Sequence, residues 1–74
     1  MATGQKAILQ DFTDRLARIL SNVNIMLHYL ENEPEAELLD PAVKSSLRNT
    51  LRKVRREVSA VISVCESALF YTEE

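Results

Sequence analysis

The stretch LQDFTDRLARILSNVNIMLHYL, residues 9–30, decides the fold. Large apolar side chains recur in it at alternating spacings of three and four residues, which places them on one face of an α-helix. Polar residues fill most of the other positions, so the helix is amphipathic and its apolar face requires a partner. The residues of that face are Leu9, Phe12, Leu16, Ile19, Val23, Met26 and Leu30.

The same spacing returns once, in the second half of the chain. Between the two stretches, Pro34 disfavours helical geometry in the residue before it and ends the first helix. Asp40 and Pro41 then begin the second, as an N-cap followed by a proline that sacrifices no hydrogen bond. The sequence predicts an all-α, antiparallel two-helix hairpin, with long helices over about 5–32 and 41–71. The second apolar face consists of Leu47, Leu51, Val54, Val58, Val61, Cys65 and Ala68.

The 74 residues are expected to form one helical-hairpin domain. Residues 1–4 are interpreted as a loose N-terminus, 33–40 as an acidic connection and 72–74 as a frayed C-terminus. Two structures remain open for the connection: a short loop, or one helical turn begun by Pro34 with Leu38 and Leu39 folded over the end of the bundle.

The apolar stripe on each helix is wider than a two-helix contact needs. With Leu9 at heptad position a and Phe12 at d, further large apolar residues fall at e and g, on both sides of the stripe. A single hairpin covers only the facing edge of each helix, and the remainder forms an apolar band larger than monomers usually expose. The additional positions are Leu20, Leu27, Ile62 and Leu69 at e, and Ile8, Tyr29, Val64 and Tyr71 at g.

This width predicts that two hairpins dimerise into a four-helix bundle, because a two-fold homodimer is the commonest closed assembly. A different protein that supplies the other two helices is the alternative. The residues predicted for the dimer or partner interface are Ile8, Phe12, Leu16, Leu20, Leu27, Val58, Ile62 and Leu69.

Composition narrows the class of protein. Apolar residues make up 46% of the chain and charged residues 27%, with one Gly and two Pro, which argues against a disordered chain and against an all-β fold. We find no catalytic, metal-ligand or nucleotide motif, so neither an enzyme nor a cofactor is expected. No apolar run approaches the roughly 20 residues that cross a bilayer, and no signal-peptide pattern is present. A cytoplasmic protein without membrane contact is therefore expected.

Charge is distributed unevenly although the net charge is only −2. Within residues 48–56, five cations occur without an acidic residue: Arg48, Arg52, Lys53, Arg55 and Arg56. Such a stripe contacts either a partner protein or the phosphates of nucleic acid. The absence of interleaved aromatic residues and the negative net charge favour the protein partner.

The single histidine and the single cysteine are the candidate reactive residues. His28 falls at the outward position f, where a phosphate-accepting histidine would lie. The chain also resembles, in outline, the dimerising phosphotransfer hairpin of sensor kinases. It has Ala17 and Arg18 where that family carries His-Glu, so the resemblance covers helix geometry and no functional residue. Cys65, within the apolar face, is expected to be a small buried hydrophobic residue.

These patterns predict a non-enzymatic protein–protein interaction module of the adaptor, regulator or co-chaperone type. It would act through its apolar helix faces and the basic stripe of the second helix. A nucleic-acid-associated regulator that uses the 48–56 run is the alternative, and phosphotransfer through His28 is a third hypothesis.

Overall fold

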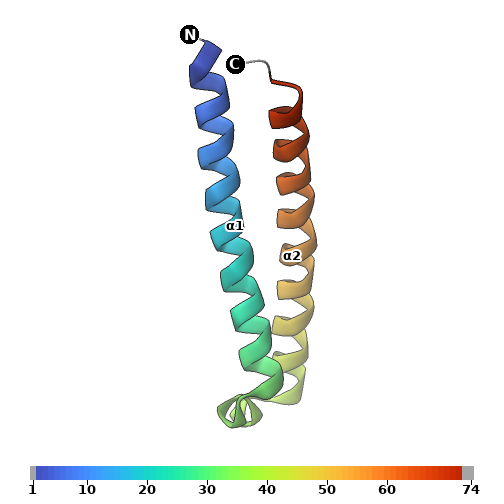
Figure 1. Cartoon of the computed structure of the whole chain (residues 1–74). Helices are drawn as coiled ribbons and strands as arrows, with labels where there is room; N and C mark the ends of the chain where they lie inside the picture. Colours follow the sequence, from blue (N-terminus) through green and yellow to red (C-terminus); the bar gives the residue numbers. More distant parts are fainter. Residues whose placement is uncertain (1, 73–74) are drawn as a thin grey trace.

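Two long helices lie side by side in opposite directions, joined by a short helical turn (Figure 1). The computed structural model describes residues 2–72, and side-chain exposure for 4–72. Helix α1 spans Ala2–Asn32, the 3₁₀ helix η1 spans Pro34–Leu38, and helix α2 spans Pro41–Phe70. The chain extends over 53 × 16 × 14 Å. The predicted all-α antiparallel hairpin is confirmed.

The helix ends differ slightly from the prediction. Helix α1 begins at Ala2, three residues earlier than expected, so the described part of the predicted loose N-terminus is helical. Helix α2 ends at Phe70, one residue early, and Tyr71 closes it by donating its N–H to the Ser67 carbonyl over 3.2 Å. Residues 1, 73 and 74, the remainder of the predicted loose and frayed ends, lie outside the described residues.

The start of α2 follows the local signal in the sequence. The Asp40 side chain accepts a hydrogen bond from the Ala42 backbone N–H over 2.8 Å, and Pro41 occupies the first helical turn. Because this N–H has no partner within the helix, the carboxylate satisfies a donor that would otherwise rely on water. The predicted N-cap is confirmed.

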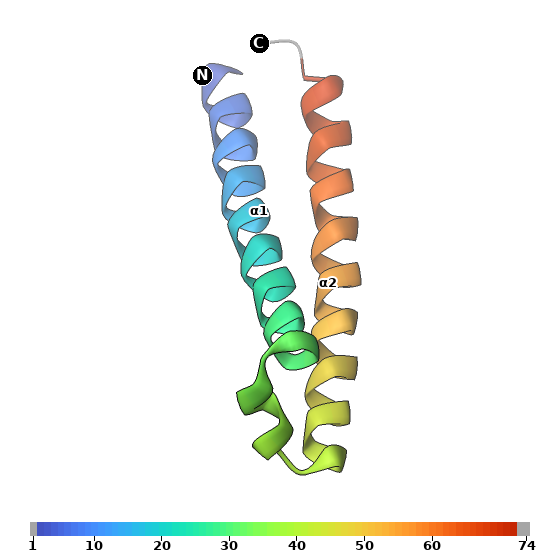
Figure 2. The same cartoon turned by 60° about the horizontal axis from the view of Figure 1, so that its bottom comes forward.

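The connection adopts the helical turn that the sequence left as one of two alternatives (Figure 2). Pro34 stands at the start of η1, and Ala36 is buried, with 1% of its surface exposed. Leu39 is half-buried, whereas Leu38 is 88% exposed. The helical-turn alternative places both leucines over the end of the bundle; this part of it is wrong for Leu38, and the buried residue of η1 is Ala36.

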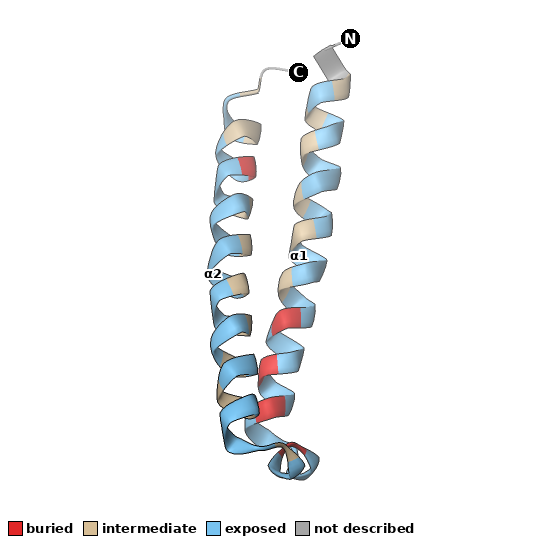
Figure 3. Ribbon diagram, turned by 180° about the vertical axis from the view of Figure 1, so that it is seen from behind, coloured by how far each residue is buried: buried red, intermediate tan, exposed pale blue. Residues whose placement is uncertain are grey.

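Buried side chains gather toward the connection (Figure 3). On α1 they are Val23, Leu27 and Leu30, one turn apart, and Ala36 adds the contact from η1. Toward the open end of the hairpin, the inward residues are half-buried and Cys65 is the buried residue of α2. The expectation of a small buried cysteine is confirmed.

On α1, the contact with the other helix runs through positions a and e rather than a and d. Neighbouring residues show the difference: Met26, at d, is 45% exposed, and Leu27, at e, is 5% exposed. Phe12 and Ile19, also at d, are 50% and 46% exposed. The predicted helix–helix contact line is therefore wrong at d on α1, whereas on α2 Val54 and Ala68, also at d, are half-buried. Apolar residues flank position a on both sides, so periodicity alone permitted either rotation of each helix.

Candidate interaction surfaces

The exposed apolar side chains lie on one side of the hairpin. Positions d and g share one flank of a helix, and in an antiparallel pair these flanks turn to the same side. Ile25, Leu38 and Phe70 are the exposed large apolar residues that fall outside this set. We call the set the docking face; its members are Ile8, Phe12, Ile19, Met26, Tyr29, Val43, Leu47, Val61, Val64 and Tyr71.

A hollow in the docking face lies between the helices on the connection side. It is lined by Met26, Tyr29 and Leu30 of α1 and by Leu47 and Leu51 of α2, and has a volume of about 250 Å³. Residues of both helices therefore share this surface. An apolar recess of this kind suits a large apolar side chain of a partner.

The opposite side of the hairpin is polar. There the Arg52 guanidinium donates a hydrogen bond to the Glu31 carboxylate over 3.1 Å and links α2 to α1. Both residues occupy position b, which lies away from the docking face. Because both side chains are about half exposed, this ion pair contributes little stability.

The basic stripe forms a patch on this polar side and along its edge. We call it the basic patch: Arg48, Arg52, Lys53, Arg55 and Arg56. Arg48 is half-buried and the other four side chains are exposed. Among the described residues, Arg52 has an ion-pair partner and the other members of the patch have none. The patch therefore presents uncompensated positive charge to solvent.

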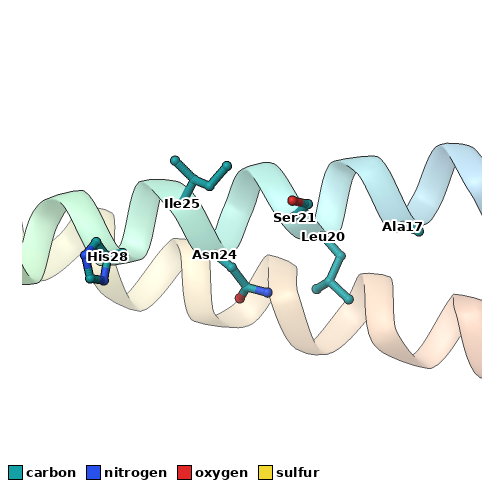
Figure 4. A pocket seen from close by; sticks show the side chains of 6 residues that line it. All are labelled: Ala17, Leu20, Ser21, Asn24, Ile25 and His28. Carbon is teal, nitrogen blue, oxygen red and sulfur yellow. The ribbon is translucent and has the colours of Figure 1, made fainter.

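His28 lies at the edge of a shallow depression on α1, lined by Ala17, Leu20, Ser21, Asn24, Ile25 and His28 itself (Figure 4). Its ring Nδ1 is 3.1 Å from the Asn32 side-chain nitrogen, which also donates to the His28 carbonyl over 3.0 Å. Asn32 thus holds the exposed imidazole from the next turn of the helix.

The residues predicted for a dimer or partner interface separate into two groups. Ile8 and Phe12 lie on the docking face, 69% and 50% exposed. The others pack inside the hairpin, where Leu27 is buried and the rest are half-buried: Leu16, Leu20, Val58, Ile62 and Leu69.

Sequence reasoning placed other docking-face residues, such as Ile19, Met26 and Leu47, inside the hairpin. Both flanks of position a are apolar, so no sequence signal distinguished the inner flank from the outer one. These residues can take part in a helix–helix contact only with the helices of another chain.

The pKa of Glu37 is lowered by a neighbouring lysine. The Lys44 ammonium donates a hydrogen bond to Glu37 over 2.9 Å, and this bond, with the attraction of the positive charge, lowers the pKa of Glu37 from its ordinary value of 4.5. This pair joins η1 to the first turns of α2.

Within residues 2–72, no group of three or more His, Cys, Asp or Glu side chains is arranged to hold a metal ion. The helices in this range also lack a segment long and apolar enough to cross a membrane. The chain has no significant match to a protein-family model, to a curated protein or to a solved structure.

Proposed function

We propose that this chain is a non-enzymatic protein–protein interaction module that binds through its docking face. The observation that carries the proposal is the alignment of exposed apolar side chains along one side of both helices. Monomeric proteins rarely expose a continuous apolar band of this length, and such bands mark sites of protein association.

The total surface supports the same conclusion. The chain exposes 5614 Å², whereas a folded monomer of 8.4 kDa typically exposes about 4,600 Å², a difference of about 1,000 Å². The docking face supplies apolar surface for a contact of that size. Burying apolar area is the main favourable contribution to protein association.

The basic patch adds charge to this module. It lies away from the docking face, so it stays accessible when the docking face is covered. Uncompensated cations attract an acidic partner surface and accelerate its association, an effect that salt screens. We assign the binding energy to the docking face, and to the basic patch the attraction of an acidic protein surface outside that contact.

The test compares the same substitution at two isoleucines that lie on different faces of α1. Ile19 lies on the docking face and is 46% exposed, and Ile25, on the same helix but outside the face, is 62% exposed. Ile19→Lys is expected to abolish binding of protein to the immobilised chain at physiological salt, because a charged group enters the apolar contact. Ile25→Lys is the matched control and is expected to bind as the wild type does.

Circular dichroism establishes that both variants remain helical. The proposal is contradicted if Ile19→Lys and Ile25→Lys bind the same proteins with the same affinity. It is also contradicted if both variants lose binding equally, since binding would then not depend on the docking face in particular.

A second candidate function, nucleic-acid binding, is favoured by one observation, the absence of ion-pair partners for Arg48, Lys53, Arg55 and Arg56 among the described residues. Cations that neutralise phosphates release counterions, so such binding falls steeply with salt. It predicts retention on double-stranded DNA at low salt that Arg55→Glu/Arg56→Glu removes. A wild-type chain that passes through at low salt excludes this candidate.

A further inference from the structure

Docking-face residues recur at even spacing on α1, at Phe12, Ile19 and Met26; on α2, half-buried Val54 lies between the exposed Leu47 and Val61. Met26 and Leu47 line the same hollow, which places them at the same level. Counting seven residues back along α1 and forward along α2, two helical turns each, brings Ile19 level with Val54. Another seven brings Phe12 level with Val61. Ile19 thus stands midway between Phe12 and Met26, and Val54 midway between Leu47 and Val61.

We propose that the occupant of the docking face is a second copy of this chain, docked head to tail, which here means a two-fold symmetric pair with the two connections at opposite ends. Phe12 of each copy then lies in the hollow of the other. The two-fold axis crosses the hairpin near Ile19 and Val54, so α1 lies against α1 of the other copy and α2 against α2. This inference rests on the proposed function and names the partner of its docking face.

Shape decides the direction of docking. Two hairpins can meet face to face with their connections at the same end or at opposite ends. Docking with the connections together places the hollow of one copy against the hollow of the other and leaves both unfilled. Docking head to tail brings the half-exposed Phe12 ring over the hollow beside Met26 and Leu47. Unfilled apolar volume is destabilising, so the head-to-tail arrangement packs better.

Charge favours the same direction. Five carboxylates lie in and around the connection; Glu31 pairs with Arg52 and Glu37 with Lys44, which leaves Glu33, Glu35 and Asp40 without an ion-pair partner among the described residues. Same-end docking brings two such groups to the same end of the dimer, and like charges repel where they approach within the screening length of about 8 Å at physiological salt. Head-to-tail docking separates them by most of the 53 Å length of the hairpin.

The area fits a symmetric dimer. A stable interface of standard size buries about 800 Å² on each partner. The chain exposes 5614 Å², about 1,000 Å² more than is typical for its mass, so one such interface removes most of the excess. The face runs along both helices, and a second hairpin of the same length covers it fully.

Mass and cross-linking together test the proposal. Light scattering or sedimentation at micromolar concentration is expected to give twice the chain mass of 8.4 kDa. Ile19→Lys, which places two ammonium groups at the two-fold axis, is expected to give the chain mass, and Ile25→Lys to remain dimeric. A wild-type chain that is monomeric at 100 µM overturns the proposal.

The relative direction of the two docked hairpins is tested in a Cys65→Ala background, which removes the native thiol. Ile19→Cys is expected to form a cross-link between two copies with a short bis-maleimide, and so is Val54→Cys, because each lies near the axis. Ile25→Cys is the control and should not cross-link above the level in denaturant. Cross-linking only in a mixture of Ile19→Cys with Val54→Cys chains indicates docking with connections together and overturns the head-to-tail arrangement.

The two proposals fail in different ways. A monomeric wild type whose protein binding is still lost in Ile19→Lys contradicts the second copy and leaves the proposed function standing. A dimer that dissociates in Ile19→Lys, while the binding of other proteins is unchanged, supports the second copy and restricts the docking face to self-association. Cross-linking of the folded chain reports on the dimer even if the lysine variant unfolds.

Discussion

The half of the hairpin next to the connection and the open half are packed differently. Next to the connection, Val23, Leu27 and Leu30 are 3 to 6% exposed, and Ala36 is 1% exposed. Toward the open end, Leu9 and Leu16 are half-buried, and Cys65 is the buried residue. Apolar residues recur along α1 at the same spacing in both halves, so this spacing does not explain the difference in burial.

The difference lies in how many segments meet. Near the connection, η1 packs against α1 at the end of the hairpin, whereas the open half has only two helices. Two cylinders touch along a line, so their flanking side chains stay in water unless another element covers them. The open half is therefore the part of the hairpin that gains most from a second chain, and head-to-tail docking covers it with the connection half of the other copy.

The largest expected effect compares one leucine from each half. Leu27→Ala removes a side chain that is 5% exposed, and loss of such a buried leucine costs about 2–5 kcal/mol of the free energy of unfolding. Leu16→Ala, in the half-buried open half, is expected to cost less, because solvent already reaches part of the side chain. Thermal and urea unfolding measure both; a larger cost for Leu16→Ala means that the open half is the better packed in solution.

A substitution in η1 tests whether its packing against α1 contributes to stability. Ala36 is 1% exposed, so the longer side chain of Ala36→Leu has to displace its neighbours, and this overpacking is expected to cost about 1–3 kcal/mol of the free energy of unfolding. Leu38→Ala, two residues away at a position that is 88% exposed, is the control and should change stability by less than about 0.5 kcal/mol. Equal unfolding midpoints for the two variants argue that η1 does not pack against the helices.

The smallest expected effect depends on pH. Because the pKa of Glu37 is lowered in the folded chain, its pairing with Lys44 stabilises the fold above the ordinary value of 4.5, and this stabilisation is lost as the pH falls through the lowered value. Glu37→Gln is therefore expected to be slightly less stable than the wild type at pH 7 and equally stable at strongly acid pH. A difference that persists unchanged at acid pH excludes the ion pair as its cause.

Much of this architecture was predictable from local signals. Asp40 and Pro41 fix where α2 begins, since the cap and the proline act within one helical turn, and Pro34 fixes where α1 ends. The basic patch was visible as a run of cations. The docking-face residues at d were not recognised as exposed, because their periodicity is identical to that of an interior position.

The sequence by itself determined the helices, their length and their antiparallel order, because periodicity, caps and a short connection are local properties. The tertiary structure decided which flank of the stripe on residues 9–30 turns inward. Leu20 and Leu27 face α2, and Phe12, Ile19 and Met26 face outward. That choice depends on how two whole helices and η1 pack together, and the pattern of one helix does not contain it.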